Sequence, residues 1–503
     1  MSGPVGTAPE ETVAAVAMRA ALAVLHACGY EDDRAALPLR LEVVRAPEPA
    51  PRADRVLPKA APGAPSGRLA LPSSAPTVRE ALRLMAVGSL TSRELVESSL
   101  AAAATFGDLG AVVAIDEEAV LAEADALDAE RRLGRTRGPL HGVPVTVKDV
   151  IDVAGLPTRA GSTAYEGLPT HDAAAVARLR EAGALVLAKV ATHEFALGVA
   201  TPQCANPHDP SRLAGGSSGG SAIAVATGIG LASLGTDTRA SLRVPAALCG
   251  VVGFKGTFGA VPTEGIVPLG WSVDHVGPIT RDAADAALVF EVLTGAPLGV
   301  PARGGPLVVG VVREAFADAD AAVAAVCEEA LRVLTAAGCT LVGLETPSAT
   351  ELELANDLGL IVSRAEAACY HRGRSTAVEQ CIPEVREQLE AARAISALDY
   401  LDAQRHRRAL AARVVECFGA CDLVAMPTTP LVAPPRDDYE RYLLRLSRNT
   451  IVWSLAGCPA ATVPCGAVGS LPVGLQLAAR PGGEATIVAG ARLFEAGAKG
   501  RFS

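Results

Sequence analysis

Three short segments of the sequence carry side chains whose types and spacing suit acyl chemistry. "VPVTVKDV" (143–150) holds Lys148 in a β-branched run, "AGGSSGGSAIA" (214–224) holds Ser217 and Ser218, and "GTDTRASLRVP" (235–245) holds Ser241. A lysine in a buried apolar strand is costly when charged, so desolvation favours its neutral amine. A neutral lysine can act as general base toward a serine hydroxyl, in place of the histidine of the usual triad.

The glycine-rich run "GGSSGG" (215–220) is open to several interpretations when it is taken alone. A flexible linker is disfavoured because the run continues directly into the apolar segment 221–230. A Walker-type phosphate loop would need a lysine at its end, and a dinucleotide-binding fingerprint would need a preceding strand, whereas residues 204–214 are rich in turn formers. A catalytic loop is the interpretation of this run that these observations favour.

One form of that catalytic loop is the nucleophile elbow G-x-S-x-G, which Gly216, Ser218 and Gly220 match. The elbow must also follow a strand, and it needs an acid and then a histidine later in the chain. None of the downstream histidines stands in a matching signature (His275, His371 and His406). The elbow motif by itself is therefore a weak signal.

A relay through a second serine fits the three segments better. Glycine-flanked Ser217 can adopt unusual backbone geometry, and its hydroxyl can pass a proton between Lys148 and a nucleophilic Ser241. The turn before Ser241 would then offer backbone N–H groups to a tetrahedral oxyanion. Taken without Lys148 and Ser217, Ser241 reads as an ordinary turn serine.

Composition describes a globular protein and gives no sign of a polyanionic partner. Half of the 503 residues are hydrophobic, a fifth are charged, and the net charge is −10. We therefore expect neither nucleic acid nor a membrane as partner.

The eleven cysteines include no C-x-x-C pair, which predicts free thiols in a reducing, cytoplasmic compartment. The acidic N-terminus argues against a signal peptide, and the apolar stretch 13–28 is too short and too charged to span a membrane.

The pattern of elements predicts one large α/β domain with a central sheet. Helical periodicity appears at 77–106 as two helices, with Thr91 or Ser92 capping the second, and again at 116–134. Strands are expected near 111–115 and 141–155 and within 471–482, residues 421–435 are expected to form a strand and then a loop, and residues 173–190 are expected to form a helix and then a strand. Further helices are expected around 282–295, 320–337, 350–371 and 384–418. Residues 1–46 are a predicted helical extension, with a Pro/Ala-rich linker at 47–74 and the main domain at 75–500.

At this point the sequence resembles the amidase signature enzymes. The matching segments are "HGVPVTVKDVIDVAGLPTRAGS" (141–162), "NPHDPSRLAGGSSGGSAIAVATG" (206–228), "LGTDTRASLRVPAALCGVVGFKGTFG" (234–259) and "SVDHVGPITRDAADAA" (272–287). The resemblance covers roughly residues 75–500. It implies a single α/β/α domain around a mixed sheet and hydrolysis of a carboxylic amide through an acyl-enzyme, with no metal and no organic cofactor.

The resemblance assigns roles to residues by motif. It implies that Ser241 is the nucleophile, Lys148 the base, Ser217 the cis-peptide serine that relays the proton, and Ser218 a supporting hydrogen-bond partner. It also implies that an oxyanion hole is made by the backbone amides of Thr238, Arg239, Ala240 and Ser241. Asp237 and Arg243 match positions expected to pair and brace this loop.

One departure from the family pattern stands beside the nucleophile. The family usually has glycine just before this serine, where this chain has Arg239 and Ala240. If the loop needs a positive φ there, the two residues cost on the order of 1–3 kcal/mol each. If it does not, Arg239 is expected at the mouth of the site, where it and Arg159 would recognise an anionic or carbonyl-rich substrate. Tyr370 is a further candidate for the pocket lining.

These features predict an amidase that acts on a small amide, carbamate or ureido compound through a Ser241 ester. Alternatives remain open at this point. The chain could be the glutamine-cleaving subunit of an amidotransferase, an acyl-transferring or amide-forming enzyme, or a binding protein impaired by the replaced glycines. A homodimer is left open as the oligomeric state.

Overall fold

The computed structural model describes residues 13–27, 75–165, 167–301, 305–372 and 378–499. The described chain from Val78 onward is built around one sheet of eleven strands, in the order β1-β3-β2-β4-β6-β5-β10-β11-β9-β7-β8. The strands are β1 (Val112–Ala114), β2 (Pro144–Lys148), β3 (Leu185–Val190), β4 (Ala232–Asp237), β5 (Val252–Lys255), β6 (His275–Thr280), β7 (Val308–Val312), β8 (Thr340–Leu344), β9 (Leu423–Pro427), β10 (Ala460–Val468) and β11 (Leu471–Ala478).

The sheet is mixed, as the resemblance implied. β3, β2 and β4 are parallel neighbours, as are β9, β7 and β8, while β4, β6, β5, β10, β11 and β9 run antiparallel to one another in turn. β2, β3 and β4 are buried along their whole length, which explains their continuous apolar and β-branched sequences. The carboxyl ends of the parallel pair β2 and β4 therefore meet at one edge of the sheet.

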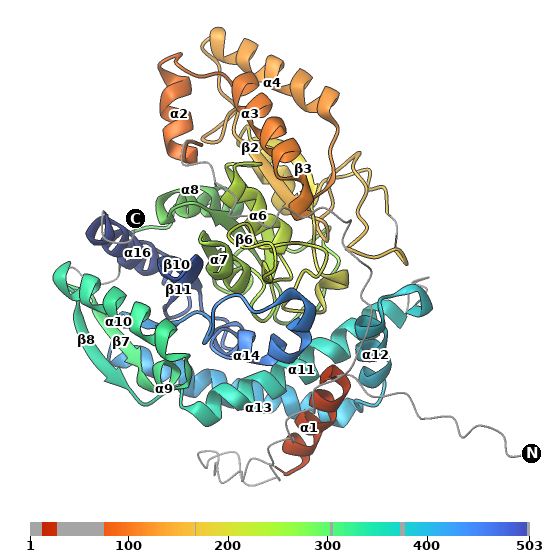
Figure 1. Cartoon of the computed structure of the whole chain (residues 1–503), viewed down its shortest axis with the longest axis vertical. Coiled ribbons are helices and arrows are strands. Elements are labelled where there is room, and N and C mark those ends of the chain that lie inside the picture. Colours follow the sequence, from red (N-terminus) through yellow and green to blue (C-terminus); the bar gives the residue numbers. More distant parts are fainter. Residues whose placement is uncertain (1–12, 28–74, 166, 302–304, 373–377, 500–503) are drawn as a thin grey trace, which may run out of the picture.

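Sixteen α-helices of the described chain surround the sheet (Figure 1). They are α1 (Val13–Ala27), α2 (Val78–Ala86), α3 (Ser92–Thr105), α4 (Glu117–Arg132), α5 (Ala174–Glu181), α6 (Gly219–Thr227), α7 (Arg243–Cys249), α8 (Ala283–Thr294), α9 (Arg313–Asp318), α10 (Ala321–Ala336), α11 (Ala349–Arg372), α12 (Pro383–Ala392), α13 (Ala397–Glu416), α14 (Leu443–Ser447), α15 (Ile451–Leu455) and α16 (Glu484–Ala498).

Helices cover both faces of the sheet, as strand β5 shows. A Cβ added to Gly253 would meet Ala246 of α7, whereas the ring of its neighbour Phe254 lies 5.0 Å from the ring of Phe290 in α8. Successive residues of a strand point to opposite faces, so α7 and α8 lie on opposite sides. The chain is thus an α/β/α domain.

The predicted helices are confirmed, except that one predicted helical stretch is divided into two helices. Thr91 caps α3 through a capping box with Glu94, because its hydroxyl accepts the backbone N–H of Glu94 and the Glu94 carboxylate accepts the N–H of Thr91. The helical stretch predicted at 384–418 is two helices, since Ser396 starts a second capping box with Asp399 and begins α13 there.

Helix α1 lies beside α11, α12 and α13 in the lower part of Figure 1, far in sequence from all three. Met18, Ala21 and Leu25 are buried there, and His26 bonds Asp399 at 2.6 Å. Within the predicted helical extension at 1–46 the structure describes helix α1, while the rest of that extension and the Pro/Ala-rich linker at 47–74 lie outside the described residues. None of the described helices has the length and apolar character needed to cross a bilayer.

Candidate active site

The site is built where β2 and β4 end side by side. Lys148 is the last residue of β2 and is fully buried, and Thr236 is the penultimate residue of β4. The Lys148 Nζ lies 2.7 Å from Ser217 Oγ and 2.8 Å from Thr236 Oγ1. The register of β2 and β4 therefore places the Lys148 amine beside the hydroxyl of Ser217 in the glycine-rich segment.

Lys148 is held close to its neutral form by its surroundings. Burial lowers its pKa to about 7, although the nearby charges of Asp237 and Asp274 act in the opposite direction. A pKa near 7 is what a general base needs at neutral pH, because both protonation states are then accessible.

The glycine-rich segment fits where larger residues would not. A Cβ on Gly216 would lie 1.8 Å from the carbonyl oxygen of Ala200, and one on Gly220 would lie 2.4 Å from the backbone nitrogen of Ala191. The peptide between Gly216 and Ser217 is cis. Close backbone approach thus explains the glycines, and the segment continues into α6 at Gly219.

Ser218 ties the glycine-rich segment to the turn that carries Ser241. Its backbone N–H donates to the carbonyl oxygen of Ser241 at 3.3 Å, and its hydroxyl donates to the carbonyl oxygen of Thr236 at 3.1 Å. Within the described ranges, the Ser241 hydroxyl has no hydrogen-bond partner, and the residue is 4% exposed. Ser217 and Ser241 therefore stand on two segments joined directly by hydrogen bonds.

The turn 238–241 between β4 and α7 has ordinary backbone conformations. Arg239 and Ala240 are absent from the residues with positive φ, so replacing glycine here costs no backbone strain. The backbone N–H groups of residues 238–241 find no acceptor in the described part of the chain. They are free to face a developing oxyanion.

A buried ion pair braces this turn. Arg243 binds Asp237 through Nε and Nη2, both at 3.0 Å, and neither side chain is exposed. Burial by itself would raise the pKa of Asp237, yet the Arg243 charge and hydrogen bonds hold it well below its usual range. The Asp237 carboxylate also accepts the N–H of Leu242, directly after the nucleophile candidate. The pair fixes both ends of the turn.

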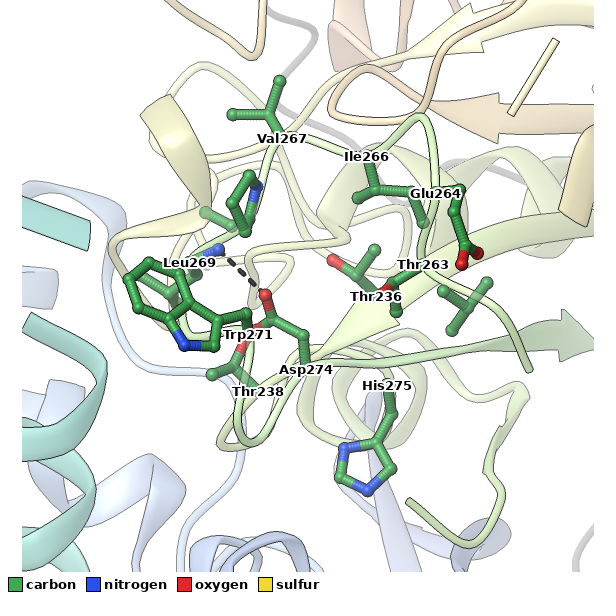
Figure 2. Close-up of a pocket in the computed structure, with 13 residues that line it drawn as sticks. Thr236, Thr238, Thr263, Glu264, Ile266, Val267, Leu269, Trp271, Asp274 and His275 are labelled. Atoms are coloured by element: carbon green, nitrogen blue, oxygen red, sulfur yellow. Dashed lines mark hydrogen bonds between the residues drawn. The ribbon is translucent and has the colours of Figure 1, made fainter. Parts of the chain in front are cut away.

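A cavity of about 300 Å³ opens beside these groups (Figure 2). Thr236 and Thr238 line it, so it reaches both the partner of Lys148 and the turn of Ser241. Asp274 also lines it, and its carboxylate accepts the Thr238 hydroxyl at 2.6 Å and the N–H groups of Leu269 and Gly270. The remaining lining is mostly apolar and comes from Ala196, Thr263, Glu264, Ile266, Val267, Pro268, Leu269, Trp271, His275 and Val276.

The residues predicted to contact substrate lie in different places. Arg239 is buried, with 4% of its surface exposed, and its guanidinium faces α11 and not the mouth of the cavity. Arg159 is exposed in the loop after β2, and Tyr370 is half-buried on α11, where its ring contacts His371. Neither Arg159 nor Tyr370 lines the cavity.

Two residues of the site were not found from the sequence. Thr236 contacts Lys148, and Asp274 holds Thr238, yet both stand in segments quoted above without a role. The antiparallel register of β4 and β6 pairs Asp237 with His275, which brings Asp274 beside Thr238. A pairing of this kind follows from the sheet and has no local sequence signal. No group of His, Cys, Asp and Glu suited to a metal ion occurs among the described residues.

Comparison with known proteins gives consistent matches over most of the chain. The family model described as Amidase matches residues 94–488. The A subunit of the glutamyl-tRNA(Gln) amidotransferase of Anaeromyxobacter sp. (strain K) is 40% identical over 475 residues, covering 83% of this chain and 95% of that protein. An amidase of Pseudomonas putida is 36% identical over 387 residues, covering 71% and 82% of the two chains. A crystal structure of an amidase superposes with a TM-score of 0.78 at 40% identity, covering 84% and 99%.

Substitution of Gly216 tests whether the close approach at the glycine-rich segment is needed. We expect Gly216→Ala to destabilise the fold by about 1–3 kcal/mol, because its methyl group would overlap the backbone of Ala200. The matched control is Gly419→Ala, where nothing lies within 4 Å of the added methyl. Thermal unfolding of both variants measures the difference, and equal midpoints would contradict the packing argument.

Proposed function

The chain belongs to the amidase signature family, and on that premise we propose that it hydrolyses amides through an ester on Ser241, with Lys148 as base and Ser217 as proton relay. The protein is an amidohydrolase that cleaves linear amide-type C–N bonds. The observation that carries the residue assignment is the 2.7 Å contact between Lys148 Nζ and Ser217 Oγ, two side chains that are both fully buried.

The first half of the reaction forms the ester. Neutral Lys148 accepts the proton of Ser217 while Ser217 accepts the proton of Ser241, and Ser241 Oγ attacks the amide carbon. The carbonyl oxygen gains a negative charge, which the N–H groups of the 238–241 turn stabilise. The C–N bond then breaks, and the proton held by Lys148 returns through Ser217 to the leaving nitrogen.

In the second half of the reaction, water hydrolyses the Ser241 ester. A water molecule gives its proton to the same relay and attacks the ester carbon, and Ser241 Oγ leaves with the returned proton. The products are a carboxylic acid and an amine or ammonia. The Asp237–Arg243 pair takes no proton in this scheme, and its part is to hold the turn that carries Ser241.

A second candidate function is favoured by a specific comparison. The 40% identical relative is named as the A subunit of a glutamyl-tRNA(Gln) amidotransferase. Such a protein would release ammonia from glutamine in a complex, whereas a self-contained amidase would turn over other amides as an isolated monomer or homodimer. The ordinary φ of Arg239 and Ala240 supports an active site over an impaired binding protein. Capture of the same ester by amines would make the chain an acyltransferase.

We also propose a reducing compartment, such as the cytoplasm, as the place of action. The described residues include ten free cysteines, of which nine are buried and only Cys369 is exposed. Burial raises the pKa of several of these thiols, including Cys204 and Cys458, to about 12, so they stay protonated and unreactive.

Activity should depend on pH through the state of Lys148. Its pKa is lowered to about 7, so the amine is protonated and unable to accept a proton below that value. We expect kcat/KM for a neutral amide to rise with pH between about 6 and 8 and to level off above, as one proton is lost. A profile that is flat or falls across this range would contradict the role of Lys148 as base.

Covalent labelling tests Ser241 directly. A fluorophosphonate should label the wild-type chain at Ser241, label Ser217→Ala more slowly, and fail to label Ser241→Ala. Ser89→Ala, a change at an exposed serine outside the site, is the matched control and should label as the wild type does. An unlabelled wild type, or a labelled Ser241→Ala, would overturn the assignment. Ammonia release from glutamine and from butanamide by the isolated chain then separates the two candidate functions.

A further inference from the structure

A second cavity, the outer cavity, lies between α11, α12 and the beginning of α13 and has a volume of about 690 Å³. Its lining is mainly apolar and includes Ala368 of α11, Leu389 of α12 and Ile395 before α13. The cavity beside the Ser241 turn, the inner cavity, has a volume of about 300 Å³. Trp271 belongs to the lining of both, so the two cavities meet at this side chain.

Trp271 presents an apolar ring on a backbone that is fixed on both sides. The N–H of Gly270 donates to the Asp274 carboxylate at 3.0 Å, and the N–H of Ser272 donates to Glu366 of α11 at 2.9 Å. The Trp271 side chain is nevertheless 48% exposed, and Figure 2 shows its ring at the end of the inner cavity away from Glu264. A large aromatic surface held in a set position between two cavities is suited to bind an apolar group.

The segment before the glycine-rich run also joins the inner cavity to α11. Ala196 lines the inner cavity, and the ring of its neighbour Phe195 lies 4.2 Å from the ring of His371, which lines the outer cavity. The inner and outer cavities are therefore neighbours along α11, and Trp271 is not their sole connection.

The polar groups of the outer cavity do not call for a charged ligand. Glu366 is buried, and its carboxylate accepts the N–H and the hydroxyl of Ser272 and, at 2.8 Å, the hydroxyl of Tyr400. The lining contains equal numbers of glutamates and arginines, so their charges balance. An uncharged, apolar group fits this cavity better than an ion does.

We propose that the outer cavity is a second substrate subsite, in which Trp271 binds an aromatic group of the amide while the scissile C–N bond lies in the inner cavity. The inner cavity is at the lower limit of the volumes that ligand pockets usually have, whereas the outer cavity is well within that range. The substrates are thus amides with a bulky apolar group, joined by a chain that passes Trp271. This inference rests on the proposed function, since it needs the bond to be cleaved in the inner cavity.

The first test compares amides that differ only by a terminal phenyl group. 5-Phenylpentanamide and pentanamide carry the difference on the acyl side, and N-(4-phenylbutyl)acetamide and N-butylacetamide carry it on the amine side. We expect kcat/KM to favour the phenyl member of at least one pair by about ten- to fifty-fold, because a ring is removed from water. That pair identifies the half of the substrate in the outer cavity. Equal rates within both pairs, or a preference for the phenyl-free amides, would overturn the proposal.

Variants of Trp271 assign the preference to this residue. Trp271→Ala should reduce the ratio of phenyl to phenyl-free kcat/KM by about fivefold or more, mainly through KM, and Trp271→Phe should keep most of it. Leu133→Ala is the matched control, because Leu133 is an exposed apolar residue outside both linings, and it should keep the wild-type ratio. An equal loss for both members of a pair would show that Trp271 does not select the aromatic group.

Cys369 allows the outer cavity to be blocked chemically. It lines this cavity and is the one exposed thiol among the ten free cysteines of the described residues. Benzyl methanethiosulfonate is attacked by the thiolate, which forms a benzyl mixed disulfide and releases methanesulfinate. The modified enzyme should lose its preference for the phenyl amides and keep its activity on the phenyl-free ones, whereas Cys369→Ser treated in the same way should keep both. A preference that survives modification of Cys369 would contradict the subsite.

Protection of the same thiol separates failure of this inference from failure of the proposed function. In Ser241→Ala, which should not turn over substrate, the preferred phenyl amide should slow the modification of Cys369, measured by peptide mass mapping, and its phenyl-free partner should not. If Ser241 is not the nucleophile, fluorophosphonate labelling of the wild type at Ser241 fails while this protection persists. If the outer cavity binds no part of the substrate, fluorophosphonate labelling succeeds and neither amide protects Cys369.

Discussion

The contact between Lys148 Nζ and Ser217 Oγ is the interaction on which the rest of the site depends. It requires a lysine at the very end of a fully buried strand and a serine held by glycines that allow its backbone to approach Ala200 and Ala191. The first condition is met because β2 and β4 are parallel neighbours whose carboxyl ends meet, and the second because Gly216 and Gly220 have no side chain. The sheet order and the glycine-rich segment therefore act together to hold the Lys148 amine beside the Ser217 hydroxyl, away from solvent.

Burial alone does not make a lysine a base in this protein. Lys148, Lys189 and Lys255 are all fully buried, and burial lowers the pKa of Lys255 to about 7 as well. Lys255, however, donates to the backbone carbonyls of Gly256 and Cys458, and Lys189 forms an ion pair with Asp149 at 3.2 Å. Of these three, Lys148 alone reaches a serine of the glycine-rich segment, so the partner, and not the pKa, distinguishes it.

The local features of the fold could be predicted because they depend on residues that are close together in the sequence. The Thr91 cap, the amphipathic helices and the segment ending in Lys148 follow from spacing, and the resemblance supplied the mixed sheet. The missing information was long-range. The pairing of β4 with β6 sets Asp274 against Thr238, and α11 brings Asn356, more than a hundred residues away in sequence, to Arg239 in the turn of Ser241. Arg239 was expected at the mouth of the site, but its side chain points into the protein, where it donates hydrogen bonds to Asn356 of α11 and to Ser447.

The proposed chemistry requires above all that Lys148 is a neutral amine at the pH where the enzyme works. The sequence contains only five lysines, so ¹⁵N-lysine labelling gives few side-chain resonances to follow by NMR. The resonance that disappears in Lys148→Met identifies Lys148 and separates it from Lys255. We expect this signal to titrate with a midpoint near pH 7. A Lys148 side chain that stays protonated up to its ordinary pKa of about 10.4 would contradict the proposed role.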